Sequence, residues 1–203
     1  MIETIKTALS TAQDLLQAFR EDAANLQEIE KLAHQIVDVY SHKGKLIVFG
    51  NGGSMCDAMH LAEELTGRYH IDRPALAALA ISDAGHLSCV ANDYGYENVF
   101  SRGVEALANA GDMVIGLSTS GNSANVIKGL QTATEKGCFT AALLGKSGGK
   151  LLDTCDFQIV APSSDTARIQ EIHGIVIHIL ISLVETELFL TPKASAIPCT
   201  QIC

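Results

Sequence analysis

The sequence predicts an α/β fold, in which a doubly wound, five-stranded parallel sheet lies between two layers of helices and follows a pair of N-terminal helices. From residue 41 on, short continuous apolar runs alternate with segments of helical periodicity. Continuous apolar strands are typical of parallel sheets covered on both faces, which gives three layers. Gly- and Ser-rich loops follow three of the runs. Because ligands bind at the carboxyl ends of parallel strands, we expect these loops to form one site.

The first 40 residues are expected to form two amphipathic helices. Apolar residues recur at helical spacing in two stripes: Ile2, Ile5, Ala8, Leu15, Leu16 and Phe19, followed by Leu26, Ile29, Leu32, Ile36 and Val37. The acidic and amide-rich residues 21–25 are expected to separate the two helices. Each stripe needs a partner, which is either the α/β core or another subunit.

The strands and the remaining helices are expected in alternation. The apolar runs predict strands at 45–49, 76–81, 113–117, 139–144 and 157–160. Helices are expected from the loop 50–54 to about residue 68, from the loop 118–123 to about 136, and from 166 to about 190. The chain is thus interpreted as one domain, with an N-terminal helical segment (1–40), an α/β core (41–190) and a tail (191–203).

The composition excludes several classes of protein. The 203 residues are 47% hydrophobic and 18% charged, which suits a compact domain rather than a disordered chain. Lys and Arg total 14 against 23 Asp and Glu, so the net charge of −9 argues against nucleic acid or an anionic membrane surface as partner. The N-terminus lacks the basic and apolar blocks of a secretory signal. No apolar run reaches the about 18 residues that a membrane span requires.

The cysteines indicate a reducing compartment. None of the six forms a C-x-x-C pair, so neither a disulfide framework nor a ribbon-type zinc site is expected. We therefore expect reduced thiols in a cytoplasmic protein. Cys199 and Cys203, in the tail, are interpreted as incidental thiols, with metal binding or cross-linking as the alternative.

Two of the loops have the composition of anion-binding sites. Residues 50–54 (GNGGS) leave backbone N–H groups uncovered at the start of a helix, but an ordinary strand-to-helix turn explains them equally well. Residues 118–123 (STSGNS) offer four hydroxyl groups, more than the one that helix capping needs. The second loop therefore predicts a site for a phosphate or for sugar hydroxyls that needs no cationic side chain.

Two helices carry polar pairs suited to a divalent metal. His60 and Glu64 lie four residues apart on one helix face, with Asp57 a turn earlier and Glu63 as a competing carboxylate. A His and a carboxylate at this spacing suit zinc or another first-row ion, although a surface pair is the simpler alternative.

The last helix provides the counterpart. Gln170 and His178 lie eight residues apart on one side, with Gly174 between them. A glycine inside a helix costs about 1 kcal/mol, which suggests that something approaches closely there. His173 is a rival to His178, and a neutral core histidine is the alternative for His178 itself.

Four motifs resemble the phosphoheptose isomerases of the sugar isomerase (SIS) domain group. They are VFGNGGSMCDAMHLAEELTGRY (48–69), AISDAGHLSCVANDYGYENVFSR (80–102), STSGNSANVIK (118–128) and RIQEIHGIVIHILI (168–181). The likeness runs from about residue 5 to residue 190. It implies a flavodoxin-like SIS fold and the conversion of sedoheptulose 7-phosphate to D-glycero-D-manno-heptose 7-phosphate, a cytoplasmic step towards lipopolysaccharide-core heptose. It also implies one zinc ion per subunit and a homotetramer packed through the N-terminal helices, with sites between subunits.

The resemblance also implies roles for individual residues. Metal ligands fall on His60, Glu64, Gln170 and His178, which selects Glu64 over Glu63 and His178 over His173. Substrate contacts fall on Asn51, Gly52, Gly53, Asn92, Asp93, Ser118, Thr119, Ser120, Ser123 and Gln170. Taken alone, the pair at 92–93 is typical of a turn. For the enediol chemistry of the family, we expect Glu64 and His178 to form the acid–base pair.

The sequence also departs from the family pattern. Met55 stands where some members carry His, and 163–167 differ from a segment that in some members holds an Asp just before the Arg. This segment is expected to shape the sugar end of the site.

Two other functions compete with phosphoheptose isomerisation. The first is a non-enzymatic SIS protein that binds the bacterial replication initiator as a tetramer. Such relatives lack the inward Glu and the second His, whereas Glu64 and His178 are both present here. The second is an isomerase of a pentose or hexulose phosphate. The long matches AEELTGRY and RIQEIH count against it.

Overall fold

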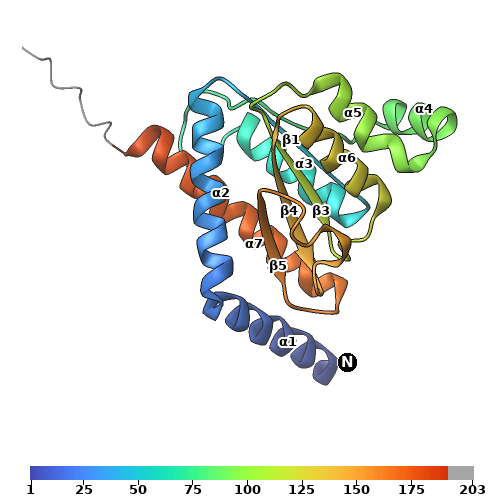
Figure 1. Cartoon of the computed structure of the whole chain (residues 1–203). Coiled ribbons are helices and arrows are strands. Elements are labelled where there is room, and N and C mark those ends of the chain that lie inside the picture. The colour runs from blue at the N-terminus through green and yellow to red at the C-terminus, as the bar shows by residue number, and fades with distance from the viewer. Residues whose placement is uncertain (192–203) are drawn as a thin grey trace, which may run out of the picture.

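The computed structural model describes residues 1–191, and its centre is a five-stranded parallel sheet (Figure 1). The strands are β1 (Leu46–Gly50), β2 (Ala78–Ala80), β3 (Met113–Ser118), β4 (Phe139–Gly145) and β5 (Phe157–Ala161). Their order is β2-β1-β3-β4-β5, and each neighbouring pair is parallel. The predicted fold class is confirmed. Most of the predicted tail, including Cys199 and Cys203, lies outside the described residues.

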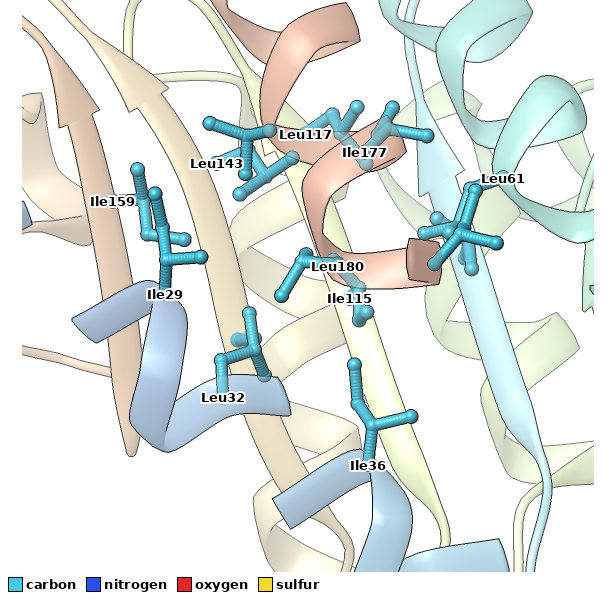
Figure 2. Packing of buried hydrophobic residues seen from close by; sticks show 14 of the residues in the cluster. Ile29, Leu32, Ile36, Leu61, Ile115, Leu117, Leu143, Ile159, Ile177 and Leu180 are labelled. Atoms are coloured by element: carbon cyan, nitrogen blue, oxygen red, sulfur yellow. The ribbon is translucent and has the colours of Figure 1, made fainter. Parts of the chain in front are cut away.

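Helices cover both faces of the sheet, and each face has its own hydrophobic layer. One face carries α2 (Ala23–Ser41), α3 (Gly53–Thr66) and α7 (Thr166–Glu185), and the other carries α4 (Ala84–Tyr94), α5 (Val99–Leu107) and α6 (Ala124–Glu135). Figure 2 shows the first layer, where Leu32 of α2 and Leu180 of α7 meet Ile115 of β3. All residues of β1 and β3 are buried, because their alternating side chains supply both layers.

The two N-terminal helices meet at a sharp break. Helix α1 (Ile2–Glu21) ends one residue before Asp22, whose carboxylate caps α2 by accepting the N–H of Ala24 at 2.9 Å. This break lies within the stretch 21–25 that the sequence predicts. Helix α1 projects from the body of the molecule (Figure 1), and Phe19 is its one buried residue. Ile2, Ile5 and Leu16 of its apolar stripe are therefore exposed in the described part of the chain, whereas Phe19, at the end of the stripe, packs into the core.

Residues 82–107 contain helices that the sequence analysis did not place. Helix α4, a 3₁₀ turn η1 (Tyr96–Asn98) and α5 follow one another there. The expectation of a turn at 92–93 is wrong, because Asn92 and Asp93 belong to the last turn of α4. Helix α4 was not predicted from the sequence, because it has no apolar stripe with helical spacing. Val90 is its one buried residue.

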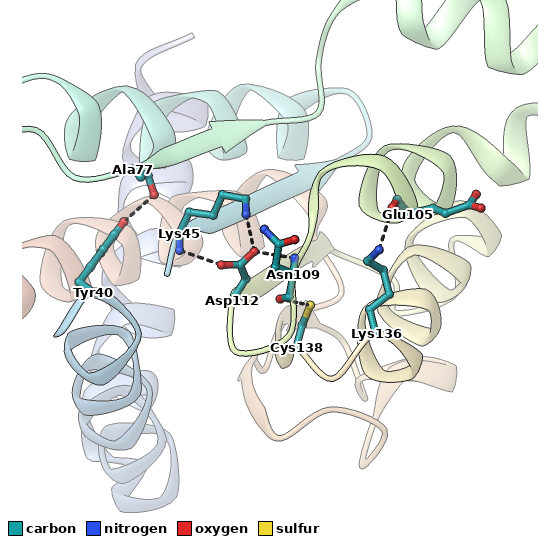
Figure 3. A network of polar contacts seen from close by, with 8 residues as sticks. All are labelled: Tyr40, Lys45, Ala77, Glu105, Asn109, Asp112, Lys136 and Cys138. Atoms are coloured by element: carbon teal, nitrogen blue, oxygen red, sulfur yellow. Dashed lines mark hydrogen bonds and ion pairs between the residues drawn. The ribbon is translucent and has the colours of Figure 1, made fainter. Parts of the chain in front are cut away.

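A buried acidic side chain joins the amino ends of the strands (Figure 3). Asp112, 3% exposed, accepts hydrogen bonds from the backbone N–H of Lys45 at 3.0 Å and of Asn109 at 2.8 Å. The ammonium of Lys45 lies 2.5 Å from the same carboxylate. Nearby, the Cys138 thiol donates to the carbonyl of Asn109, and burial raises its pKa. This network stabilises the starts of β1 and β3, at the end opposite the Gly- and Ser-rich loops.

Helix α7 is the central helix of its layer. Together with the π-helical turn η3 (Thr186–Leu190) it is the one segment of the described chain long and apolar enough to cross a membrane. Its composition has another explanation, because α7 contacts α2, α3 and β4. Side chains such as Ile169, Val176 and Ile177 are fully buried in that core.

Candidate functional site

The three Gly- and Ser-rich loops lie side by side at the carboxyl edge of the sheet. Strands β1 and β3 pair up to Gly50 and Leu117, and β3 and β4 pair up to Ser118 and Leu144. The loops 50–54, 118–123 and 145–149 therefore start at neighbouring positions. The second and third loops pack so closely that a Cβ at Gly121 would overlap the carbonyl of Gly148. Two reasons therefore favour glycine at position 121: a side chain would clash with Gly148, and the backbone φ of 63° is one that other residues rarely adopt.

A reciprocal amide pair joins the first two loops. Asn51 donates to the Asn125 side chain at 2.9 Å and accepts from it at 2.8 Å. The Tyr96 hydroxyl also donates to the side-chain oxygen of Asn51, at 3.1 Å. The Asn51 side chain, expected to contact substrate, is thereby engaged with two residues that the sequence analysis missed. No sequence signal pointed to Asn125 or Tyr96, because the contacts span 74 and 45 residues.

The hydroxyl-rich loop ends at an uncapped helix. Ser118 is buried, and its Oγ lies 3.2 Å from the Oγ of Ser123 and accepts the N–H of Gly121 at 3.1 Å. Ser123 is the N-cap residue of α6 and makes no side-chain capping bond. Thr119 and Ser120 are half-buried beside it. Hydroxyl donors and the N-terminal amides of α6 can therefore bind an anion here.

Three side chains of the types that can ligate a metal, from α3 and α7, converge beside these loops. Nε2 of His60 lies 3.4 Å from Oε1 of Glu64 and 3.3 Å from Nε2 of His178. All three atoms lie within 4.8 Å of one another. The side chains of His60 and Glu64 are 35% and 18% exposed, and His178 is exposed, so the cluster is open on one side.

Two of the three separations within this cluster fit a small divalent ion, and the third, between Glu64 and His178, is no more than 4.8 Å. Tetrahedral ligands at about 2.0–2.1 Å from zinc lie about 3.3–3.4 Å apart, which matches the two distances at His60. Two imidazoles and a carboxylate also leave a fourth position open, as in catalytic zinc sites. One turn earlier on α3, Oδ2 of Asp57 is buried and has no hydrogen-bond partner among the described residues. Burial raises the pKa of Asp57, and the charge of His60 opposes that shift.

Gln170 lies at the loop end of the two helices. A Cβ at Gly53 would overlap the side-chain amide of Gln170, so Gly53 lets the first turns of α3 and α7 approach each other. Gln170 stands two turns before His178 on α7. By contrast, apart from its neighbours and the surrounding backbone of α7, no atom of the described chain lies within 4 Å of a Cβ placed at Gly174. The close approach expected at Gly174 is therefore not made within the described chain.

The structure distinguishes the rival residues that spacing alone left open. Glu63 is exposed on the outside of α3, whereas Glu64 faces His60. His173 is fully buried, and its Nε2–H donates to the carbonyl of Leu144 at 2.9 Å. Burial lowers the pKa of His173 to about 4. His173 is thus a neutral core histidine, and His178 is the one that faces α3.

The depressed pKa of His173 makes stability depend on pH. Because the unfolded chain binds this proton with a pKa of about 6.5 and the folded chain with a pKa of about 4, stability falls as the pH drops through that window. We expect the free energy of unfolding to lose about 2–3 kcal/mol from this group between pH 7 and 4.5. Urea unfolding of the wild type and of His173→Gln, whose amide can still donate to Leu144, measures it. An equal pH dependence of the two proteins would contradict the assignment.

The remaining predicted residues are dispersed around the loops. Gly52 is the exposed N-cap residue of α3, with φ of 57°. Asn92 and Asp93 are exposed on α4, where the Asn92 amide donates to the Asp93 carboxylate at 2.7 Å. Within the described residues, no side-chain hydrogen bond joins this pair to the loops. In the divergent segment 163–167, Asp165 caps α7 by accepting the N–H of Ala167 at 2.9 Å.

Comparisons with known proteins identify similar chains. The profile of the SIS domain family matches residues 9–145. The chain is 52% identical over 187 residues to a phosphoheptose isomerase of Aeromonas hydrophila, covering 92% of this chain and 97% of the relative. It is 48% identical over 183 residues to one of Fusobacterium nucleatum, covering 90% and 94%. The solved phosphoheptose isomerase of Neisseria gonorrhoeae superposes with a TM-score of 0.85 at 35% identity, covering 91% and 98%.

Proposed function

Because this chain belongs to the SIS domain family and, within it, to the phosphoheptose isomerases, we propose that it converts sedoheptulose 7-phosphate to D-glycero-D-manno-heptose 7-phosphate. The observation that carries the proposal is the convergence of His60, Glu64 and His178 beside three loops able to hold a phosphate. A non-enzymatic SIS protein would not need this cluster. The identity to named isomerases, over nearly the whole chain, supports the same reaction class.

The phosphate is assigned to the second loop and to the start of α6. Ser118, Ser120 and Ser123 supply hydroxyls, and the start of α6 supplies the N–H groups of Ala124 and Asn125, whereas that of Val126 donates to the Asn125 side chain at 3.0 Å. Thr119 and the first loop, with Gly52 and Gly53, complete the set of proposed contacts, and Asn92 and Asp93 are proposed for the sugar. A helix N-terminus favours negative charge, so no lysine or arginine is needed.

The comparisons support a heptose substrate over a pentose or hexulose phosphate. The relatives that are 52% and 48% identical to this chain, over at least 90% of its length, are named phosphoheptose isomerases.

Glu64 and His178 are proposed as the acid–base pair. One of them removes the proton from C1 while the other protonates the oxygen on C2, which gives the enediol. The proton on the C1 oxygen then returns to the second group, and the first returns its proton to C2. Proton transfer by positioned groups of this kind contributes about 10²–10⁴-fold to rate. A carboxylate has two oxygens, so Glu64 can face a metal with one and the substrate with the other.

We also propose zinc as the metal, one ion per subunit, held by His60, Glu64 and His178, with Gln170 as a further ligand. When bound, zinc supplies polarisation of the substrate carbonyl and stabilises negative charge at its oxygen. The exposed apolar stripe of α1 supports a homotetramer packed through the N-terminal helices, with sites between subunits. A cytoplasmic location agrees with four cysteines that are free in the described chain.

Removal of the metal should abolish the reaction reversibly. We expect the zinc-loaded protein to convert sedoheptulose 7-phosphate, and a chelator to lower the rate at least about 10²-fold, since metal activation contributes several kcal/mol. Product analysis with and without chelator, followed by re-addition of zinc, measures this. Ribulose 5-phosphate serves as the control substrate. Absence of product in zinc-supplemented buffer would favour the binding-protein alternative, and faster turnover of the pentose phosphate would favour the smaller-sugar one.

A further inference from the structure

The connection between α3 and β2, residues 67–77, contains a buried ion pair with α7. The side chains of Arg73 and Glu185 are 1% and 4% exposed, and Nε of Arg73 lies 3.0 Å from Oε1 of Glu185. The other oxygen of Glu185 accepts the backbone N–H of His70 at 3.2 Å. Phe189 of η3 covers the guanidinium at 5.9 Å. We call residues 67–77 the strap, because they bind α3 and α7 together.

The same guanidinium binds the end of α3. Its Nη2–H donates to the carbonyl of Glu64 at 2.8 Å, and its Nη1–H donates to that of Leu65 at 2.9 Å. The last carbonyls of a helix have no partner within the helix, so Arg73 acts as a side-chain cap for this turn. Glu64 is thus held through its backbone while its carboxylate faces His60.

The strap also reaches the ligand on α7. Glu185 lies seven residues, or about two turns, after His178, so both residues are on the same side of α7. The ring of Tyr69 stacks over the His178 imidazole, with centroids 5.9 Å apart and planes inclined at 20°. Tyr69 is in turn packed edge-on against His70 at 4.0 Å. The strap therefore contacts the backbone of one proposed ligand and the ring of another.

We propose that the strap sets the separation of α3 and α7 at the metal-ligand cluster, with Arg73 as the positioning residue. The identity of the metal and of the reaction rests on the proposed function. The contacts of Arg73 and Tyr69 are observed in the structure and do not depend on it. Arg73 joins Glu64 of α3 to Glu185 of α7, and Tyr69 limits the orientation of His178. These are the two helices whose relative placement brings Nε2 of His60 within 3.3 Å of Nε2 of His178.

A purely stabilising role explains the ion pair less well. Burying two charges costs desolvation, and well-packed apolar replacements of buried pairs are often as stable or more stable. What an arginine adds is a planar fork with fixed donor directions. Here that fork meets one carboxylate and two carbonyls from two helices, which specifies geometry. Groups that orient metal ligands in this way typically affect metal affinity or activity about 10–100-fold when altered.

The test compares Arg73→Lys with a matched variant that disturbs another buried pair. Lysine keeps the charge but loses the fork, so we expect cobalt affinity, measured by chelator competition, to fall about 10–100-fold. The visible spectrum of bound cobalt, which reports ligand geometry, should change as well. Asp112→Asn disrupts a buried pair at the opposite end of the strands and should leave cobalt affinity within threefold. Urea unfolding of both variants establishes that the loss of stability is comparable.

Further variants and outcomes keep the proposal testable. If Arg73→Lys does not fold, Glu185→Gln and Tyr69→Leu are measured instead, with Tyr69→Phe expected to restore the wild-type spectrum. Wild-type cobalt affinity and spectrum in these variants would overturn the strap proposal. If the wild type binds cobalt but does not isomerise sedoheptulose 7-phosphate, the proposed function fails while the cobalt measurements still decide on the strap. If the wild type binds no cobalt, an unchanged kcat in Arg73→Lys overturns the strap.

Discussion

Glu64→Gln is expected to lower kcat about 10²–10⁴-fold at saturating zinc. Glutamine has nearly the same volume and keeps the backbone carbonyl that Arg73 binds, so the change removes the charge and the proton-accepting oxygen alone. The free energy of unfolding should change little, because the one ion-pair contact of the Glu64 side chain within residues 1–191 is its 3.4 Å contact with the partly exposed His60. Initial rates with sedoheptulose 7-phosphate, together with the zinc content of the protein, measure the effect.

The control for this variant is its neighbour on the helix. Glu63 has the same side chain but is exposed on α3, so Glu63→Gln should retain wild-type kcat and zinc content. The comparison also separates two contributions of Glu64. If excess zinc restores metal content but not kcat, the carboxylate acts in proton transfer as well as in metal binding. If kcat recovers to within tenfold once zinc is restored, Glu64 is a metal ligand and the base is another group.

The sheet was predictable because burial on both faces leaves a strong local signal. Four of the five strands have the predicted bounds to within one residue, as the run 113–117 shows against β3 (Met113–Ser118). The exception is β2, predicted at 76–81 and observed at Ala78–Ala80. As an edge strand it pairs with β1 alone and none of its residues is fully buried. Its sequence is therefore less constrained, and a run of alanines does not define its ends.

The candidate site was predictable where helical periodicity applies. His60 and Glu64 lie four residues apart on α3, and the structure brings them together as that spacing requires. The pairing of the two helices was a different matter. His178 joins His60 across 118 residues, and Arg73 joins Glu185 across 112. Contacts of this kind depend on how α3 and α7 pack, which no local pattern encodes.

The net negative charge of the chain does not exclude binding of a sugar phosphate. A net charge of −9 disfavours polyanions, whose affinity depends on many cationic contacts. A single phosphate needs only a few well-placed donors, and the loop 118–123 with the uncapped start of α6 provides them without any charged side chain. A count of charged residues does not include the partial charges at helix ends. Composition can therefore argue against a polyanion that binds a large surface, but not against a single phosphate that binds in a pocket.

His178→Ala is expected to lower kcat at least about 10²–10⁴-fold and to weaken zinc binding, because the change removes one proton-transfer group and one ligand. The side chain is exposed, so the free energy of unfolding of the metal-free protein should stay within about 0.5 kcal/mol of wild type. Initial rates, zinc affinity and urea unfolding of the metal-free protein provide the three measurements.

The matched variant His173→Ala should give the opposite result. It lies five residues earlier on the same helix, is fully buried, and donates to the carbonyl of Leu144. Its removal deletes that buried hydrogen bond and opens a cavity, so we expect a loss of about 2–4 kcal/mol in the free energy of unfolding. Zinc affinity and the kcat of the folded protein should stay within a few-fold of wild type. Were the two variants to exchange these phenotypes, His173 would be the functional histidine, and the arrangement of α7 against α3 would have to differ from the one described.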